Sequence, residues 1–65
     1  MNILQASRKA AALSDGNNGE DYDVAFVCPD RERGEGFYAI TEHYYIMHCE
    51  GETIARVYIG GMRDS

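Results

Sequence analysis

The chain has 65 residues, of which 45% are hydrophobic, and this length and composition indicate one small folded domain and exclude a fully disordered chain. A domain of this size buries only about 60% of the surface that its unfolded chain exposes, so its stability is expected to be roughly 3–5 kcal/mol. Eleven acidic residues against six lysines and arginines give a formal net charge of −5 at pH 7. This charge argues against direct binding to nucleic acid or to an anionic membrane and favours a basic protein surface as partner; the alternative is that it only keeps the protein in solution.

The first element expected in chain order is a helix at about residues 2–14. Asn2 can cap its start, with Gln5 in the position that completes a capping box. The apolar residues that follow have helical spacing, from Ile3 to Leu13, and three consecutive alanines favour a helix. The stripe is narrow and made of small residues, so this helix is expected to lie close against a sheet.

Three strands are expected after it, at about residues 24–28, 37–49 and 53–59. Pro29 ends the first, and a charged loop at 30–36 leads into the second, which is rich in aromatic and β-branched residues. Glu50-Gly51 is expected to form a two-residue turn, and Gly60-Gly61 to end the third strand before a polar tail. The sequence therefore predicts a single α+β domain over residues 1–65, with an N-terminal helix packed on a three-stranded antiparallel β-meander.

Strand alternation in this meander sorts the side chains onto two faces. The face under the helix is expected to carry Ala25, Val27, Ile40, Ile46, Ala55, Val57 and Ile59. The second face is expected to carry Phe26, His43, Tyr45, Met47, Ile54, Arg56 and Tyr58. Since one helix covers one face, the Tyr, Met and Arg side chains of the second face are expected to be exposed as an interaction surface. A different register, a bulge in the long strand or curling of the sheet would bury them instead.

No catalytic, metal or cofactor site is expected. His43 and His48 have opposite parity on a continuous strand, and the two cysteines lack the spacing of a zinc site. No glycine-rich phosphate loop precedes a helix, and residues 15–23 lack the ligand spacing of a calcium loop. The protein is therefore expected not to be an enzyme and to need no cofactor.

The acidic residues suggest mimicry of nucleic acid, because carboxylates spread over one surface can occupy a groove that otherwise holds DNA. Those expected to contribute are Asp15, Glu20, Asp21, Asp23, Glu42, Glu50 and Glu52. The loop at 30–35 is nearly neutral in sum, because Arg31 and Arg33 offset most of its three acids. The acidity is expected to matter functionally only if the 15–23 stretch, Glu42 and the Glu50–Glu52 turn share one surface.

In overall character the chain resembles the small phage-encoded anti-CRISPR proteins, in particular inhibitors of type I-C systems. The resemblance runs from the helix at 2–13 through Asp21-Tyr22-Asp23 to Tyr58-Ile59-Gly60-Gly61. That class shares no motif, so no functional residue is carried over. The resemblance implies a non-enzymatic inhibitor that binds the surveillance complex (Cascade) and blocks its recruitment of target DNA.

Two other functions remain open. One is a protein–protein interaction module or homodimer that uses Tyr45, Met47, Arg56 and Tyr58, although a monomer is the expected state. The other is an inhibitor of a different nucleic-acid enzyme. The N-terminal segment has Arg8 and Lys9 at its centre and no continuous apolar stretch, so it does not read as a signal peptide, and the host bacterial cytoplasm is the expected location.

Overall fold

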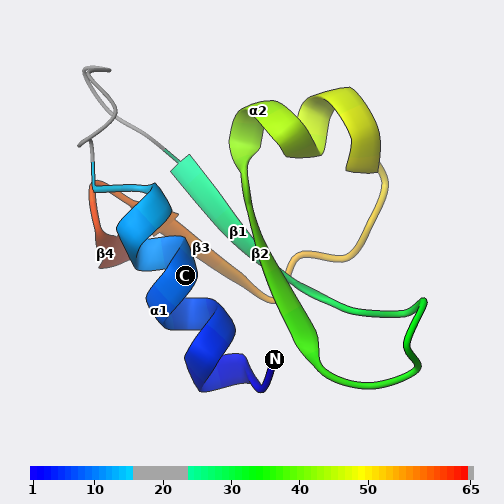
Figure 1. Cartoon of the computed structure of the whole chain (residues 1–65). Coiled ribbons are helices and arrows are strands. Elements are labelled where there is room, and N and C mark those ends of the chain that lie inside the picture. Colours follow the sequence, from blue (N-terminus) through cyan, green and yellow to red (C-terminus); the bar gives the residue numbers. More distant parts are fainter. Residues whose placement is uncertain (16–23, 65) are drawn as a thin grey trace.

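The computed structural model describes residues 1–15 and 24–64, and of Cys49 only the backbone. Its elements are α1 (Ile3–Leu13), β1 (Val24–Pro29), β2 (Phe37–Thr41), α2 (Glu42–Tyr44), the π-helix η1 (Tyr45–Cys49), β3 (Arg56–Ile59) and β4 (Met62–Arg63). Within the described residues the strands form a four-stranded antiparallel sheet in the order β2-β1-β3-β4. The fold is α+β, with the N-terminal helix packed on this sheet and a short second helical segment beyond β2 (Figure 1).

Helix α1 forms where the sequence predicts it. The Asn2 side chain accepts a hydrogen bond from the backbone N–H of Gln5 at 2.8 Å, and the Gln5 side chain accepts one from the N–H of Asn2 at 3.0 Å. This reciprocal pair is the predicted capping box, and it satisfies backbone donors that the first helical turn leaves without a partner. The helix ends at Leu13, with Ser14 as its C-cap.

One face of the sheet packs against α1 to form the hydrophobic core. In this face Val27 lies opposite Ala39 of β2 and Arg56 of β3. The buried residues that make up the core are Ala6, Ala10, Ala25, Val27, Ala39 and Tyr58. Alanines dominate on both sides of this contact, so the helix lies close to the sheet, as the narrow apolar stripe predicts.

The predicted strand at 37–49 is wrong in its second half. Residues 42–49 continue β2 as a helical segment formed by α2 and η1, which we call helical segment 42–49. Thr41 caps it, because its hydroxyl accepts a hydrogen bond from the N–H of Tyr44 at 3.2 Å. The segment then folds onto the sheet through Tyr45, whose ring meets that of Phe26 edge-on with 5.1 Å between centroids. Packing and capping therefore outweigh the β propensity of its Tyr and Ile residues.

The predicted meander is also wrong. Strand β1 lies at the centre of the sheet and pairs with both β2 and β3, so β3 is not the neighbour of β2 and Glu50-Gly51 joins no hairpin between them. The expected hairpin decides which side chains of β3 face α1. Without it the register of β3 differs, and a shift of one residue moves every side chain of a strand to the opposite face of the sheet. Tyr58 lies opposite Ala25 on the face under α1, whereas Val57 lies opposite Phe26 on the other face.

A short hairpin replaces the expected end of the sheet. Gly60 and Gly61, with φ of +59° and +84°, turn the chain so that β4 pairs with β3. Two consecutive residues with positive φ are the requirement of a type I′ turn, which glycine meets without a steric penalty. Part of the segment expected to be a polar tail is therefore an edge strand.

Candidate functional site

The structure separates the predicted acidic residues that it describes. Asp15 follows α1, at the end of the helix where the Ser14 hydroxyl accepts a hydrogen bond from the N–H of Gly61 at 3.0 Å. Glu42 is the first residue of helical segment 42–49. Glu50 and Glu52 follow this segment, on the opposite side of the molecule from Asp15 (Figure 1). These carboxylates therefore do not share one surface with Asp15. The remaining predicted acids, Glu20, Asp21 and Asp23, lie outside the described residues.

The residues predicted for the second sheet face are also dispersed. Tyr58 is only 8% exposed and belongs to the core under α1. Arg56 is half-buried on the same side, where its guanidinium donates a hydrogen bond to the Ser7 hydroxyl at 3.0 Å. Tyr45 is half-buried against Phe26, and Met47 alone is well exposed, on helical segment 42–49. The predicted Tyr/Met/Arg sheet surface is therefore wrong as a continuous face.

A hollow of about 500 Å³ lies on the face of the sheet away from α1, between β2, helical segment 42–49 and the loop after β1. Two of its walls carry aromatic rings: Tyr38 on β2, and Tyr44 and His48 on the helical segment. Its polar lining comes from Asp30, Arg31, Glu32 and Glu52. We call this hollow the acidic aromatic groove.

The aromatic wall of the groove is held by helical geometry. Tyr44 and His48 are four positions apart, so their rings meet on one side of the segment, with centroids 4.6 Å apart and planes tilted by 43°. Tyr44 is 51% exposed, so much of its ring still meets solvent. Tyr45, the next residue, points inward and donates its hydroxyl to the backbone oxygen of Glu52 at 2.7 Å. One side of the segment thus anchors it, and the other presents rings to the groove.

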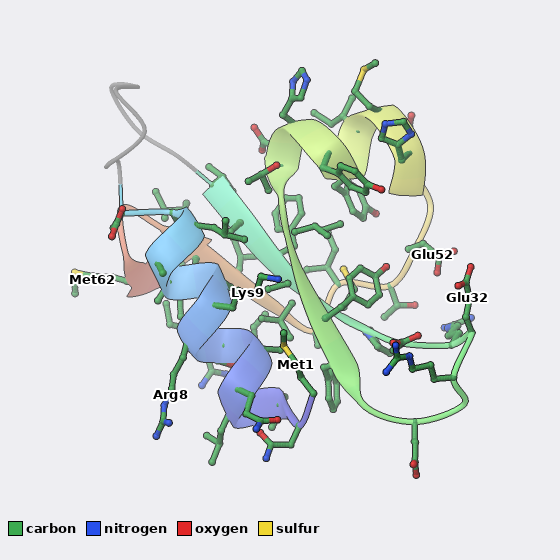
Figure 2. The ribbon with its side chains drawn as sticks, in the orientation of Figure 1. Met1, Arg8, Lys9, Glu32, Glu52 and Met62 are labelled. Carbon is green, nitrogen blue, oxygen red and sulfur yellow. The ribbon has the colours of Figure 1, made fainter. Side chains whose placement is uncertain are left out.

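Two loops bring the carboxylates of the groove to one side of the molecule. The Arg31 guanidinium donates a hydrogen bond to the Thr53 hydroxyl at 3.0 Å, which links the loop after β1 to the segment before β3. Glu32 and Glu52 then extend into solvent from these two loops on the same side (Figure 2). Asp30 lies 3.8 Å from the Arg33 guanidinium, so its charge is partly offset.

The groove carries a negative formal charge. Its three carboxylates against the single guanidinium of Arg31 leave −2, with His48 counted as neutral. The cations Arg8 and Lys9 lie on α1, well apart from Glu32 and Glu52 (Figure 2). Carboxylates beside exposed aromatic rings form an environment that favours a positively charged organic group.

The described residues show no arrangement for metal binding. Within 1–15 and 24–64, no group of three or more His, Cys, Asp or Glu side chains is placed to hold a metal ion. Buried side-chain nitrogen and oxygen atoms in these residues all have hydrogen-bond partners. No helix in the described part of the chain has the length and apolar character needed to cross a membrane.

Comparison of this chain with protein-family models, with curated proteins and with solved structures gives no match.

Several residues of the groove are not predicted as site residues from the sequence. Glu32 belongs to a loop whose charges nearly cancel in sum. In the structure, however, the two arginines of this loop contact other residues: Arg31 contacts Thr53, and Arg33 lies beside Asp30. Tyr44 and His48 become neighbours only in a helix, because on a strand they share one face but lie far apart. The i, i+4 spacing of Tyr44 and His48, following a cap at Thr41, is the signal that points to this pair.

Proposed function

We propose that this protein is a non-enzymatic inhibitor that binds a basic surface of a nucleic-acid-handling protein complex. The observation that supports it best is the acidic aromatic groove, which gathers Glu32, Glu52 and exposed rings on one side of the molecule. The resemblance to anti-CRISPR proteins gives the proposal its most specific form. In that form the partner is a type I surveillance complex in the bacterial cytoplasm, and the bound protein blocks recruitment of target DNA.

The charge distribution favours this mode of action over a general effect on solubility. The acidic groups of the groove lie apart from Arg8 and Lys9 of α1, so these two cations do not offset the negative charge of the groove (Figure 2). A basic DNA-binding channel would attract the acidic side first, which raises the association rate and orients the encounter. Aromatic rings in the contact would then contribute affinity that is independent of salt.

The test uses a purified type I-C surveillance complex and a labelled target duplex. Addition of the protein is expected to reduce duplex binding, and its own affinity for the complex is expected to fall as salt rises. Two sets of substitutions then compare the acidic regions: E32Q with E52Q, and E20Q with D21N and D23N. Inhibition that needs neither region, or binding that does not respond to salt, would refute a charge-based mechanism.

A second candidate function is a self-association or protein-interaction module. Helical segment 42–49 exposes three large apolar side chains within four positions: Tyr44 at 51%, Ile46 at 57% and Met47 at 63%. Tyr and Met side chains are enriched at interface centres. Light scattering after size-exclusion chromatography distinguishes this function, since a homodimer would have twice the mass of 7.3 kDa and would dissociate on substitution of Met47 by Glu.

A further inference from the structure

We infer that the acidic aromatic groove is a receptor for an arginine side chain of the partner protein. This inference rests on the proposed function and adds to it the chemical group that the groove recognises. The groove has three features that together select this group: an exposed aromatic wall, carboxylates at the rim, and an opening to solvent.

The aromatic wall is suited to a planar cation. A cation over the face of a tyrosine ring is attracted by the ring's quadrupole, and a guanidinium can also stack on it. Tyr44 presents such a ring, half exposed and in contact with the ring of His48, which also lines the groove, at 4.6 Å between centroids. Because Tyr45 fastens the helical segment to Phe26 and Glu52, the ring is held in place before any ligand arrives.

The carboxylates at the rim favour arginine over lysine. Glu32 and Glu52 come from two different loops and extend into solvent on the same side of the molecule, so two carboxylates flank the groove (Figure 2). A guanidinium offers five N–H donors in a rigid fork and can meet several such oxygens at once, whereas an ammonium is a compact point charge.

Size and chemistry make two other occupants less favourable than a side chain. About 500 Å³ lies within the usual range of ligand pockets, roughly 300–1,000 Å³, but the hollow is open on one side and would not enclose a whole small molecule. A metal ion is disfavoured because the described residues bring no three metal-binding side chains together. A side chain that enters from another protein fits both observations.

The test is a nuclear magnetic resonance titration of the intact, isotope-labelled chain at low salt. The probe is the tripeptide acetyl-Gly-Arg-Gly-amide, and the comparison peptides carry lysine or citrulline, the neutral analogue of arginine. The arginine peptide is expected to shift the resonances of Tyr44 and His48, and the lysine peptide to bind at least about twofold more weakly. The citrulline peptide is expected to leave both residues unchanged at the same concentrations.

A matched pair of double variants separates the groove from overall charge. E32Q with E52Q removes two acids that line the groove, whereas E42Q with E50Q removes two that do not, at the same change in net charge. The first pair of substitutions is expected to weaken binding of the arginine peptide roughly three- to tenfold, and the second pair less than twofold. Circular dichroism and urea unfolding show whether each variant keeps its fold.

Equal binding of the arginine and citrulline peptides, or equal loss in the two double variants, would overturn the inference. Different results would refute the proposed function and the arginine-binding role of the groove. If the arginine peptide binds as expected but the protein leaves duplex binding by the surveillance complex unchanged, the groove stands and that inhibitor function is wrong. If the protein blocks duplex binding equally well with E32Q and E52Q, the inhibitor function stands and the groove is not the contact.

Discussion

Tyr45 is expected to hold helical segment 42–49 against the sheet, and its removal tests this most sharply. Its ring meets Phe26 edge-on, and its hydroxyl donates to the backbone oxygen of Glu52 at 2.7 Å. Replacing Tyr45 by Phe removes only the hydrogen bond. Since water can still reach the Glu52 oxygen, the loss is expected to be about 0.5–1 kcal/mol.

Replacing Tyr45 by Ala removes the ring as well. A half-buried ring covers on the order of 100 Å², which corresponds to about 2.5 kcal/mol at 25 cal/mol per Å². The edge-on contact with Phe26 adds roughly 0.5–1.5 kcal/mol. The sum approaches the whole stability expected of a domain this small, roughly 3–5 kcal/mol, so Tyr45→Ala is expected to be largely unfolded or to lose the segment's structure.

Urea unfolding followed by far-ultraviolet circular dichroism measures these differences. With a slope of about 1 kcal/mol per molar urea, Tyr45→Phe is expected to lower the midpoint by about 0.5–1 M. Tyr44→Ala is the matched control, because Tyr44 is the adjacent residue of the same type but is 51% exposed, and it is expected to change stability by less than about 1 kcal/mol. Equal effects at positions 44 and 45 would refute this anchoring, and so would a stable Tyr45→Ala variant with an unchanged spectrum.

Three further substitutions test other contacts of the fold. Ser14→Ala removes the buried hydroxyl that accepts a hydrogen bond from the Gly61 N–H at 3.0 Å, and thermal unfolding is expected to show a loss of about 1–2 kcal/mol. An unchanged midpoint would contradict a stabilising role for this hydrogen bond. Gly36→Ala would place a Cβ 2.9 Å from the Met1 backbone oxygen, whereas Gly34→Ala, also at positive φ, meets open space. The substitution at position 36 is therefore expected to reduce stability clearly more than the one at position 34. Equal losses would show that only backbone strain matters. Asn2→Ala removes the cap of α1 and is expected to reduce the free energy of unfolding by about 0.5–2 kcal/mol in urea titrations, a result that an unaltered midpoint would contradict.

The parts of the fold that local rules determine could be predicted from sequence. Asn2 and Gln5 form the expected capping box, and the spacing from Ile3 to Leu13 places α1 within a residue of its observed ends. The first strand and the charged loop after it also agree, because Pro29 marks a boundary through its missing N–H. In each case the determining residues lie within a few positions of the structure that they define.

The parts of the fold that depend on contacts between distant residues could not be predicted from the sequence. Tyr45 carries a strand-forming side chain, and its contact with Phe26, nineteen positions earlier, is a long-range interaction that favours the helical segment. The position of β3 beside β1 follows from pairing across the whole chain, so the faces assigned to Arg56 and Tyr58 were exchanged. The β3–β4 hairpin is different, because its turn residues Gly60-Gly61 form a local turn signal, although the polar residues after them do not indicate a strand.

The difference between local and distant contacts also explains why the groove could not be predicted. The acidic stretches in sequence suggest charge, but the groove combines Glu32 and Glu52 with Tyr44 and His48, which come from separate segments. The link from Arg31 to Thr53 that joins two of these segments spans 22 positions. No pattern within a single window predicts such a combination.

The association rate between this protein and a type I surveillance complex, measured at several salt concentrations, tests the proposed function most directly. We expect the rate to fall steeply between about 50 and about 500 mM salt, as the screening length shortens. With E32Q and E52Q we expect slower association at low salt and convergence with the unsubstituted protein at high salt, whereas E42Q with E50Q has a smaller effect. Identical rates for the unsubstituted protein and the E32Q/E52Q variant at every salt concentration would contradict a role for the acidic aromatic groove in partner binding.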